Sequence, residues 1–320
     1  MASVKVHLDT DIGGDIDDLC ALALLLAWPG VEITGVTTEL EHGGKRAGYA
    51  RYALELAGRG DVPVAAGADV GLGCFRQGEY GFPPEARYWP EPVSSAPGPL
   101  ETALDLLEES IERAAIVVAI GPFTNLSLLE RRSPGALRRA QLCLMGGSIV
   151  PAPPGFPAWD HEMDFNTQSD AAAALHVLEA ADPERITIVP LEVTAQTALR
   201  RAHLPALRRS GPLGALLAGR AEAFAVDENH EERYGRSCAG FARRHHQLPP
   251  RPACLRGRAG LGWREGGGAA IGAGDGGRLV PRAHCRWRPP PARGDSLARR
   301  QVQRDVGGHS DGTGVMSRES

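Results

Sequence analysis

Short runs of aliphatic and β-branched residues alternate with longer amphipathic segments along the first two thirds of the chain. The apolar runs are short and bounded by Gly, Pro or Asp, which is typical of buried strands. The predicted strands span residues 4–10, 31–38, 62–67, 114–122, 140–148 and 184–193. The predicted helices span residues 17–29, 45–60, 99–113 and 169–182.

Strands that alternate with helices indicate right-handed crossover connections and a parallel sheet. We therefore expect an α/β fold, with a Rossmann-like, doubly wound, mostly parallel sheet and helices on both faces. In such sheets ligands bind outside the carboxyl ends of the strands. Four polar or glycine-rich segments lie at the carboxyl ends of predicted strands and should meet at that edge: an aspartate cluster after residue 8, TGVTTE, IGPFTN and LMGGS.

Residues 71–99 interrupt this alternation. Their Gly, Pro and aromatic content predicts a long loop over the same edge, such as a flap over a substrate. An ordinary surface excursion is the alternative interpretation.

The composition changes abruptly after Cys238. Residues 240–320 contain 16 Gly, 15 Arg and 7 Pro but no Lys, which argues against a packed core. We therefore expect an α/β domain at residues 1–238, incomplete at its C-terminal end, and a disordered tail at residues 239–320. The chain has 35 basic residues and only two of them, Lys5 and Lys45, are lysines, as a GC-rich gene would produce. A frameshift in such a gene explains the tail, whereas a natural RNA-binding tail is the alternative.

Charge and cysteine content narrow the function classes. The net charge of −4 gives no global attraction to nucleic acid or to an anionic membrane. No uncharged apolar segment reaches 18 residues, so no membrane span is expected. The six cysteines form no C-x-x-C pair and suggest neither a zinc ribbon nor a disulfide framework. These features together predict a cytoplasmic protein.

Five aspartates lie within ten residues, from the end of the first predicted strand to the start of the following helix: Asp9, Asp11, Asp15, Asp17 and Asp18. Like charges this close need a cation or shared protons, and several carboxylates at a strand end suit one divalent cation. The N-terminus of the following helix would help to keep them ionised. Alternatively, Asp17 and Asp18 only cap that helix, while Asp9 and Asp11 are solvated. The spacing is not that of an EF-hand.

The motif DTDIGGDIDDLCAL resembles the opening motif of the calcium-dependent nucleoside hydrolases of the inosine/uridine-preferring type. Further motifs follow in the order found in that family: GVTT, IGPFTN, LMGGS, MDFNTQSDAAAAL and VPLEVTAQTAL. The resemblance covers residues 4–238. It implies hydrolysis of ribonucleosides to base and ribose by a water held on Ca²⁺, with a small-molecule nucleoside as the partner. It also implies a homo-oligomer, either a dimer or a tetramer.

The resemblance also implies roles for single residues. Asp11 would bind the metal and act as the general base, and Asp18 would bind the metal. Asp15, which the longer loop of this chain adds, is a further candidate ligand, and Thr124 would contribute its backbone carbonyl. The ribose would be held by Asp17, Asp164, Asn166 and His42. Among local alternatives, Thr124 and Asn125 cap the following helix, and Asn166 forms an Asx turn.

Several positions depart from the family pattern. His42 stands where an asparagine is usual, Asp164 replaces a glutamate, and Ala195 stands where a histidine often occurs. The late H-D-P segment that supplies the last aspartate ligand is absent from the frame as written. The codons permitted for residues 241–254 read, when shifted by one base, as LPDDIINFLHDPLA, which restores it. We therefore expect this polypeptide to be impaired in metal binding.

Two other functions remain open from the sequence. A catalytically degenerate ribose- or nucleoside-binding paralogue would keep the pocket without turnover. A magnesium phosphatase with a D-x-D motif would use Asp9 as its nucleophile and Asp11 as its acid. That second interpretation lacks the later Lys and acidic residues that phosphate chemistry needs.

Overall fold

The structure is a computed structural model that describes residues 3–72, 85–90, 93–235, 238 and 247–248. All of them belong to one compact unit, residues 1–263, while a second unit at residues 264–320 lies outside the described residues. The predicted tail at residues 239–320 therefore falls almost wholly outside them.

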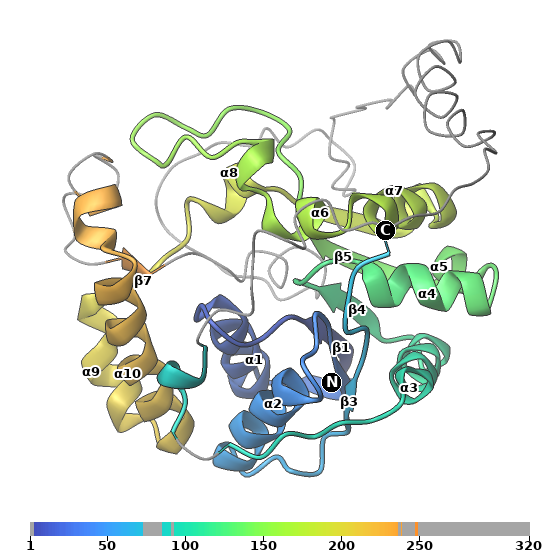
Figure 1. Cartoon of the computed structure of the whole chain (residues 1–320), viewed down its shortest axis with the longest axis horizontal. Coiled ribbons are helices and arrows are strands. Elements are labelled where there is room, and N and C mark those ends of the chain that lie inside the picture. Colours follow the sequence, from blue (N-terminus) through green and yellow to red (C-terminus); the bar gives the residue numbers. More distant parts are fainter. Residues whose placement is uncertain (1–2, 73–84, 91–92, 236–237, 239–246, 249–320) are drawn as a thin grey trace, which may run out of the picture. The chain divides into compact units, whose positions relative to one another are not determined.

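The described elements follow the predicted alternation (Figure 1). The strands are β1 (Val4–Thr10), β2 (Val31–Thr38), β3 (Val64–Ala66), β4 (Ile116–Ala119), β5 (Gln141–Met145), β6 (Ile186–Val189), β7 (Leu199–Arg200) and β8 (Gln247–Leu248). The helices are α1 (Asp17–Ala27), α2 (Lys45–Leu56), α3 (Leu100–Glu112), α4 (Thr124–Arg132), α5 (Ala136–Arg139), α6 (Phe165–Ser169), α7 (Ala171–Ala180), α8 (Leu191–Thr194), α9 (Leu204–Arg209) and α10 (Pro212–Asp227).

Six strands form one sheet in the order β3-β2-β1-β4-β5-β6, and every neighbouring pair is parallel. The chain leaves β1 toward one edge and returns to β4 on the other side, so the strand order reverses beside β1. This is the Rossmann-like, doubly wound order that the sequence predicted. The crevice for a ligand in such a sheet lies at this reversal, outside the carboxyl ends of β1 and β4. Strands β7 and β8 form a separate antiparallel pair.

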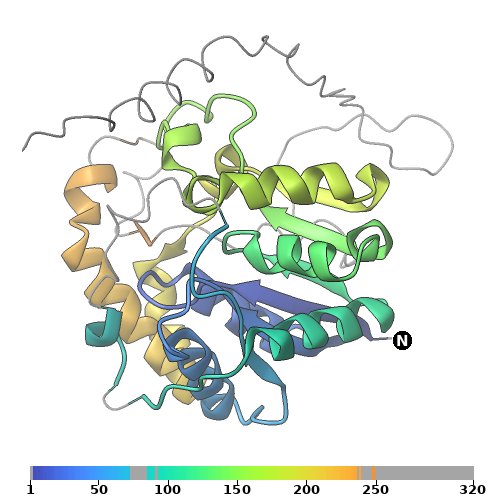
Figure 2. The same ribbon diagram turned by 45° about the vertical axis from the view of Figure 1, so that its right-hand side comes forward.

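Helices cover both faces of the sheet (Figure 2). Alternate residues of β4 and β5 point to opposite faces, as the pleat requires. Val118 and Cys143 pack in the cluster that contains α1, α2 and α10. Val117 and Leu142 pack in the cluster that contains α3, α4 and α7. The sheet is therefore buried on both sides, which explains its continuous apolar strands.

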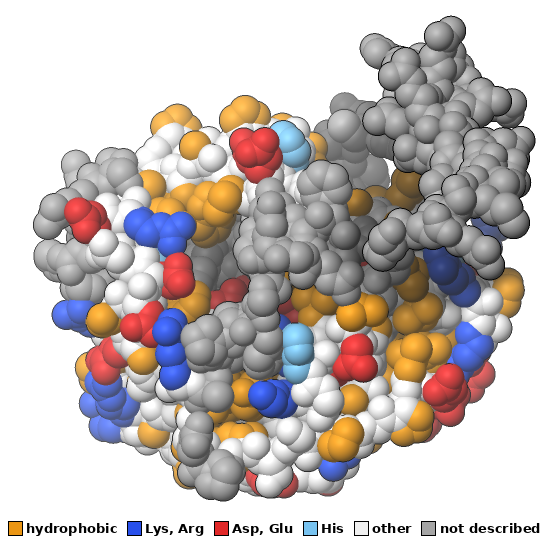
Figure 3. Space-filling view, viewed as in Figure 1, with side chains coloured by type: hydrophobic (Ala, Val, Ile, Leu, Met, Phe, Trp, Pro, Cys, Tyr) orange, Lys and Arg blue, Asp and Glu red, His pale blue; other side chains and the backbone are white. Residues whose placement is uncertain are grey.

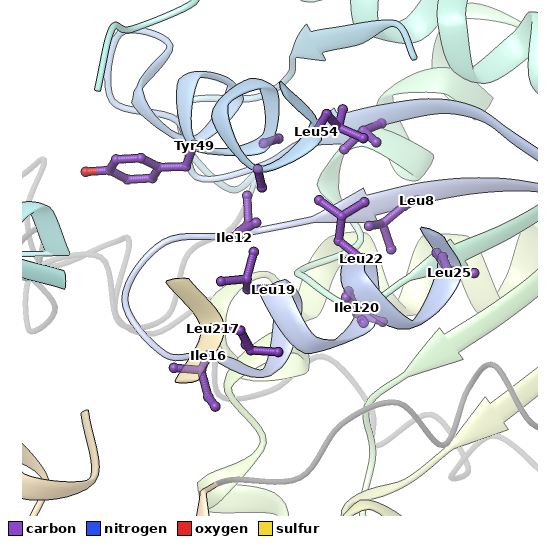
Figure 4. Close-up of a cluster of buried hydrophobic side chains, with 14 of the residues drawn as sticks. Leu8, Ile12, Ile16, Leu19, Leu22, Leu25, Tyr49, Leu54, Ile120 and Leu217 are labelled. Carbon is purple, nitrogen blue, oxygen red and sulfur yellow. The ribbon is translucent and has the colours of Figure 1, made fainter. Parts of the chain in front are cut away.

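The loop between β1 and α1 is fixed by two isoleucines. Ile12 and Ile16 are fully buried and lie with Leu19 and Leu217 in the core (Figure 4). Because apolar and acidic residues are interspersed along this loop, burying the isoleucines restricts where the aspartates can point. The hydrophobic pattern thus positions the acidic cluster.

Several predicted elements were too long, and one predicted strand ran into a helix. The strand predicted at residues 184–193 ends at Val189, and helix α8 begins at Leu191. Pro190 lies between them, and its missing N–H and fixed φ end the ladder there. Among the described helices, none has the length and apolarity that crossing a membrane requires.

Candidate active site

Buried carboxylates gather at the carboxyl edge of the sheet. The acidic side chains with at most 6% of their surface exposed are Asp9, Asp17, Asp18, Glu39, Glu41, Asp164, Asp170 and Glu192. The space-filling view shows acidic side chains recessed in a hollow of one face (Figure 3). Burial of so many carboxylates is expensive unless donors, shared protons or a cation compensate their charge.

Three of the predicted residues form a group suited to a metal ion. Asp15, Asp17 and Asp18 each offer a carboxylate oxygen, and these atoms lie within 4.8 Å of one another. Asp17 and Asp18 occupy the first turn of α1, where the helix dipole favours negative charge. The N-cap of this helix is Ile16, whose side chain makes no capping hydrogen bond. The burial of both aspartates, each 1% exposed, together with their closeness to Asp15 favours a shared site over a purely local role.

A threonine of β1 orients the group. The Thr10 hydroxyl donates to Asp18 Oδ1 at 2.5 Å, and the Ile12 N–H donates to the same hydroxyl at 3.2 Å. One threonine thus fixes the Asp18 carboxylate and the backbone of the loop together.

Asp11 lies against the loop that follows β4. A Cβ atom built on Gly121 would lie 2.9 Å from Asp11 N and 3.0 Å from Asp11 Oδ1. This approach leaves no room for a side chain at residue 121, which explains the glycine in IGPFTN. The structure therefore brings the first and third predicted edge segments, the aspartate cluster and IGPFTN, into contact at the strand reversal.

Asp9 does not belong to the group of Asp15, Asp17 and Asp18, and it is fully buried. Its side chain has no exposed surface, and its Oδ1 accepts hydrogen bonds from Thr37 Oγ1 at 2.5 Å and Asn125 Nδ2 at 2.9 Å. Burial raises the pKa of Asp9 to about 6, although hydrogen bonds involving Glu39, Thr37 and Asn125 oppose the shift. The expectation of a solvated Asp9 is wrong. A buried Asp9 also excludes the phosphatase interpretation, which needs this carboxylate to reach a substrate.

Glu39 pairs with Asp9 and was missed by the sequence analysis. Burial and the charge of Asp9 raise the pKa of Glu39 well above its usual value, so the two carboxyls share a proton. Glu39 also accepts from the N–H groups of Thr124 at 3.2 Å and Asn125 at 2.6 Å. An acidic residue directly after a buried strand, in TGVTTE, was the signal that could have found it.

Thr124 begins α4, as its place in IGPFTN suggested. Its hydroxyl donates to Asp170 Oδ2 at 2.8 Å, while the side chain of Asn125 reaches Asp9. The alternative that these two side chains cap α4 is wrong, because the carboxylate of Glu39 occupies that place. Whether the Thr124 carbonyl binds a metal remains a prediction.

Asn166 crosses from α6 to the sheet. Its Nδ2 donates to the carbonyls of Ile120 at 2.7 Å and Met145 at 3.0 Å, so its amide does not serve a local Asx turn. Its Oδ1 is buried and has no hydrogen-bond partner among the described residues. A buried acceptor of this kind is costly unless a ligand donates to it.

Asp164 and His42 occupy different surroundings. Asp164 is buried and caps α6, since its carboxylate accepts from Gly147 N at 2.6 Å and Thr167 N at 3.3 Å. His42 is exposed, and its pKa is lowered by partial desolvation and the charge of Arg46. Their predicted contacts with ribose remain predictions.

The predicted flap is only partly described. Residues 73–84 and 91–92 lie outside the described part, but Tyr88 and Trp89 belong to the core. The Trp89 indole N–H donates to the Gly13 carbonyl at 2.9 Å. This portion therefore packs against the acidic loop, residues 11–16 between β1 and α1, and supports it.

The described donor set fits a hard divalent cation. Several carboxylates converge at low exposure, and Asn166 Oδ1 is a buried neutral oxygen at the same edge of the sheet without a hydrogen-bond partner among the described residues. Carboxylate, carbonyl and amide oxygens are the ligands that Ca²⁺ and Mg²⁺ take. This edge of the sheet therefore carries both a candidate metal site and a buried acceptor that a polar ligand could satisfy.

Comparisons with known proteins give one consistent family. The profile of the family "inosine-uridine preferring nucleoside hydrolase" matches residues 6–247. An uncharacterised protein of Schizosaccharomyces pombe is 32% identical, over 66% of this chain and 69% of that protein. The pyrimidine-specific ribonucleoside hydrolase RihA of Citrobacter koseri is 28% identical, over 73% of this chain and 74% of that protein.

Solved structures of nucleoside hydrolases share the fold. The plant nucleoside hydrolase PpNRh1 aligns with a TM-score of 0.57 at 26% identity, over 74% of this chain and 75% of that one. A purine-preferring ribonucleoside hydrolase from Gardnerella vaginalis aligns with a TM-score of 0.61 at 22% identity, over 77% of each chain.

Proposed function

Because the chain belongs to the inosine-uridine preferring nucleoside hydrolase family, we propose that it hydrolyses the N-glycosidic bond of ribonucleosides to free base and ribose, with Ca²⁺ as its cofactor. The observation that carries the proposal is the group formed by Asp15, Asp17 and Asp18, at the same edge of the sheet as the buried acceptor of Asn166. A cation and a sugar hydroxyl would satisfy both features at once.

The proposed metal ligands are Asp11, Asp15, Asp18 and the carbonyl of Thr124. Bound there, Ca²⁺ would offset the charge of the carboxylates and lower the pKa of a coordinated water. Thr10 holds Asp18 in place through its short hydrogen bond, so that this ligand is oriented before binding.

The proposed chemistry uses the remaining side chains around the sugar. Asp11 takes the proton from the attacking water as general base. Asp17, Asp164, Asn166 and His42 hold the ribose hydroxyls. The nearby carboxylates also stabilise the positive charge that develops on the sugar as the bond to the base breaks.

We further propose that residues 239–320 are a frameshift product and that the correct frame supplies the missing H-D-P ligand segment. Support comes from the shifted codons, which restore helical spacing and a ligand together, and from Ile188 of β6, the last strand of the described sheet, whose side chain is 42% exposed. The restored enzyme is proposed to be a cytoplasmic dimer or tetramer.

The test is ribose release from inosine and from uridine by the chain as written and by a version corrected by one base. Each protein is stripped with EDTA and assayed with and without added Ca²⁺. We expect Ca²⁺-dependent release by the corrected version and little by the chain as written. In the corrected version, Asp11→Asn should lower the rate of ribose release by about 10²–10⁴-fold. Asp61→Asn, the same change at an exposed residue paired with Arg59, should not.

The other outcomes separate the proposals. Equal Ca²⁺-dependent release by both versions would remove the frameshift proposal and keep the hydrolase. Nucleoside binding without release in both would favour the degenerate paralogue. Release that survives EDTA would overturn the role of the cation.

A further inference from the structure

A buried arginine of α10 donates hydrogen bonds to the backbone of the acidic loop, about 200 residues earlier in the chain. Arg220 lies on α10, is 2% exposed, and donates from one nitrogen, Nη2, to three successive carbonyls of the loop. The acceptors are Gly13 O, Gly14 O at 3.0 Å and Asp15 O at 3.3 Å. A loop whose carbonyls converge on one cation is held in a single conformation.

An aromatic stack supports the arginine. Its guanidinium carbon lies 4.0 Å from the ring centroid of Trp89, which itself donates to the Gly13 carbonyl. Trp89 stacks on Tyr49 of α2, with ring centroids 4.3 Å apart and planes 4° from parallel. Cation–π contact strengthens when water is excluded, as it is here. The loop is thus clamped by α2, α10 and the segment after β3.

The charge of Arg220 also lies near the acidic group. Its Nη2 is 3.3 Å from the backbone carbonyl of Asp15, one of the three grouped aspartates. A buried cation at this position offsets part of the mutual repulsion of the carboxylates.

We propose that Arg220 is a positioning residue for the metal site: it fixes the backbone of residues 13–15, and so presets the spacing of Asp15, Asp17 and Asp18. This inference rests on the proposed function, because it assumes that these carboxylates face a cation. Arg220 itself touches neither metal nor substrate. Its effect is on metal affinity, through the loop.

The test is calorimetric titration with Ca²⁺ of the EDTA-stripped protein in the version corrected by one base, whose metal site is proposed to be complete. Arg220→Met keeps an unbranched apolar stem against Trp89 but removes the donors and the charge. We expect it to weaken Ca²⁺ binding by about 10–100-fold, the range found for groups that orient metal ligands. Arg220→Lys should give partial rescue, because an ammonium keeps the charge but cannot match the planar fork and its stacking. Arg208→Met, at an exposed arginine of α9, is the matched control and should bind as the parent does.

Asp18→Asn separates the two proposals. Loss of binding in Asp18→Asn together with parental affinity in Arg220→Met would overturn the positioning role and leave the metal site intact. Unchanged binding in Asp18→Asn would instead overturn the proposed site itself. Graded weakening from Lys to Met would support the positioning role, since a mere packing role would make Met the milder change.

A second variant covers the case in which Arg220→Met does not fold, as judged by near-ultraviolet circular dichroism. Trp89→Phe keeps a ring on Tyr49 but removes the hydrogen bond to Gly13. We expect a several-fold loss of Ca²⁺ affinity in Trp89→Phe and a larger one when it is combined with Arg220→Lys. Parental affinity in both of these variants would overturn the inference.

Discussion

His7 should make the fold sensitive to mild acid. This residue of β1 is fully buried, and its ring lies 2.9 Å from Ser110 Oγ and 2.9 Å from Thr37 Oγ1. Since the Thr37 hydroxyl donates to Asp9, it accepts from His7, which assigns the proton of the neutral ring to Nε2. Ser110 then donates to Nδ1, so the neutral ring is satisfied on both sides and a second proton has no acceptor.

Burial lowers the pKa of His7 from 6.5 to about 3. The unfolded chain therefore takes up a proton as the pH falls through 6.5, while the folded chain takes it up only near pH 3. The contribution of His7 to stability is complete above pH 6.5 and declines below it by about 1.4 kcal/mol per pH unit. Between pH 7.5 and pH 4.5 the loss should be about 2.7 kcal/mol.

The assay is urea unfolding in EDTA at several pH values, for the parent and for His7→Gln. Gln retains a donor and an acceptor but does not titrate. The free energy of unfolding of His7→Gln should therefore fall by about 2.7 kcal/mol less than that of the parent over this pH range. The pair of Asp9 and Glu39 makes a contribution to stability that increases as the pH falls, because burial raises the pKa values of both carboxyls. This contribution is present in the parent and in His7→Gln, so it cancels in the difference between their pH profiles. Parallel pH profiles for the two proteins would refute the reasoning.

Five further substitutions, at four residues, have definite expected outcomes. Glu39→Gln should raise the free energy of unfolding at pH 8 in urea titrations, because an amide can donate to Asp9 without the proton uptake that the buried Glu39 carboxyl needs. Glu39→Ala should lower it, because the N–H groups of Thr124 and Asn125 would lose their acceptor. Gly121→Ala should lower Ca²⁺ affinity in calorimetry, since its methyl meets Asp11. Gly219→Ala has open space at an exposed position of α10 and should stabilise that helix by about 0.5–1 kcal/mol. Ile16→Ala should cost about 2–5 kcal/mol of unfolding free energy in the same urea assay, from the cavity it leaves.

The hydrophobic pattern predicted the sheet well because its strands are buried on both faces. The predicted bounds of β1 and β2, residues 4–10 and 31–38, agree with the structure. Those runs are continuous and end in polar residues, so little else fits them. The pattern failed at residues 190–194, where an apolar run continues past Pro190 but the missing N–H ends the strand.

The direction in which each carboxylate points could not be predicted from the sequence. Asp9 and Asp11 look alike in DTDIGG, yet Asp9 turns into the protein toward Thr37 and Asn125. This choice depends on donors that arrive from β2 and α4, which no local pattern encodes. The pairing of Asp9 with Glu39 was missed for the same reason.

Two hydrogen bonds that support the acidic loop differ greatly in sequence separation. Thr10 donates to Asp18, eight residues away, whereas Arg220 donates to the Gly13 carbonyl, 207 residues away. A loop that needs both is fully ordered only when α10 has docked on α1. Metal affinity at the first strand should therefore depend on the integrity of the last described helix, although that helix supplies no ligand. A break in the reading frame shortly after α10 would then affect the site in two ways: through the ligand it removes, and through any loss of packing that keeps Arg220 in place.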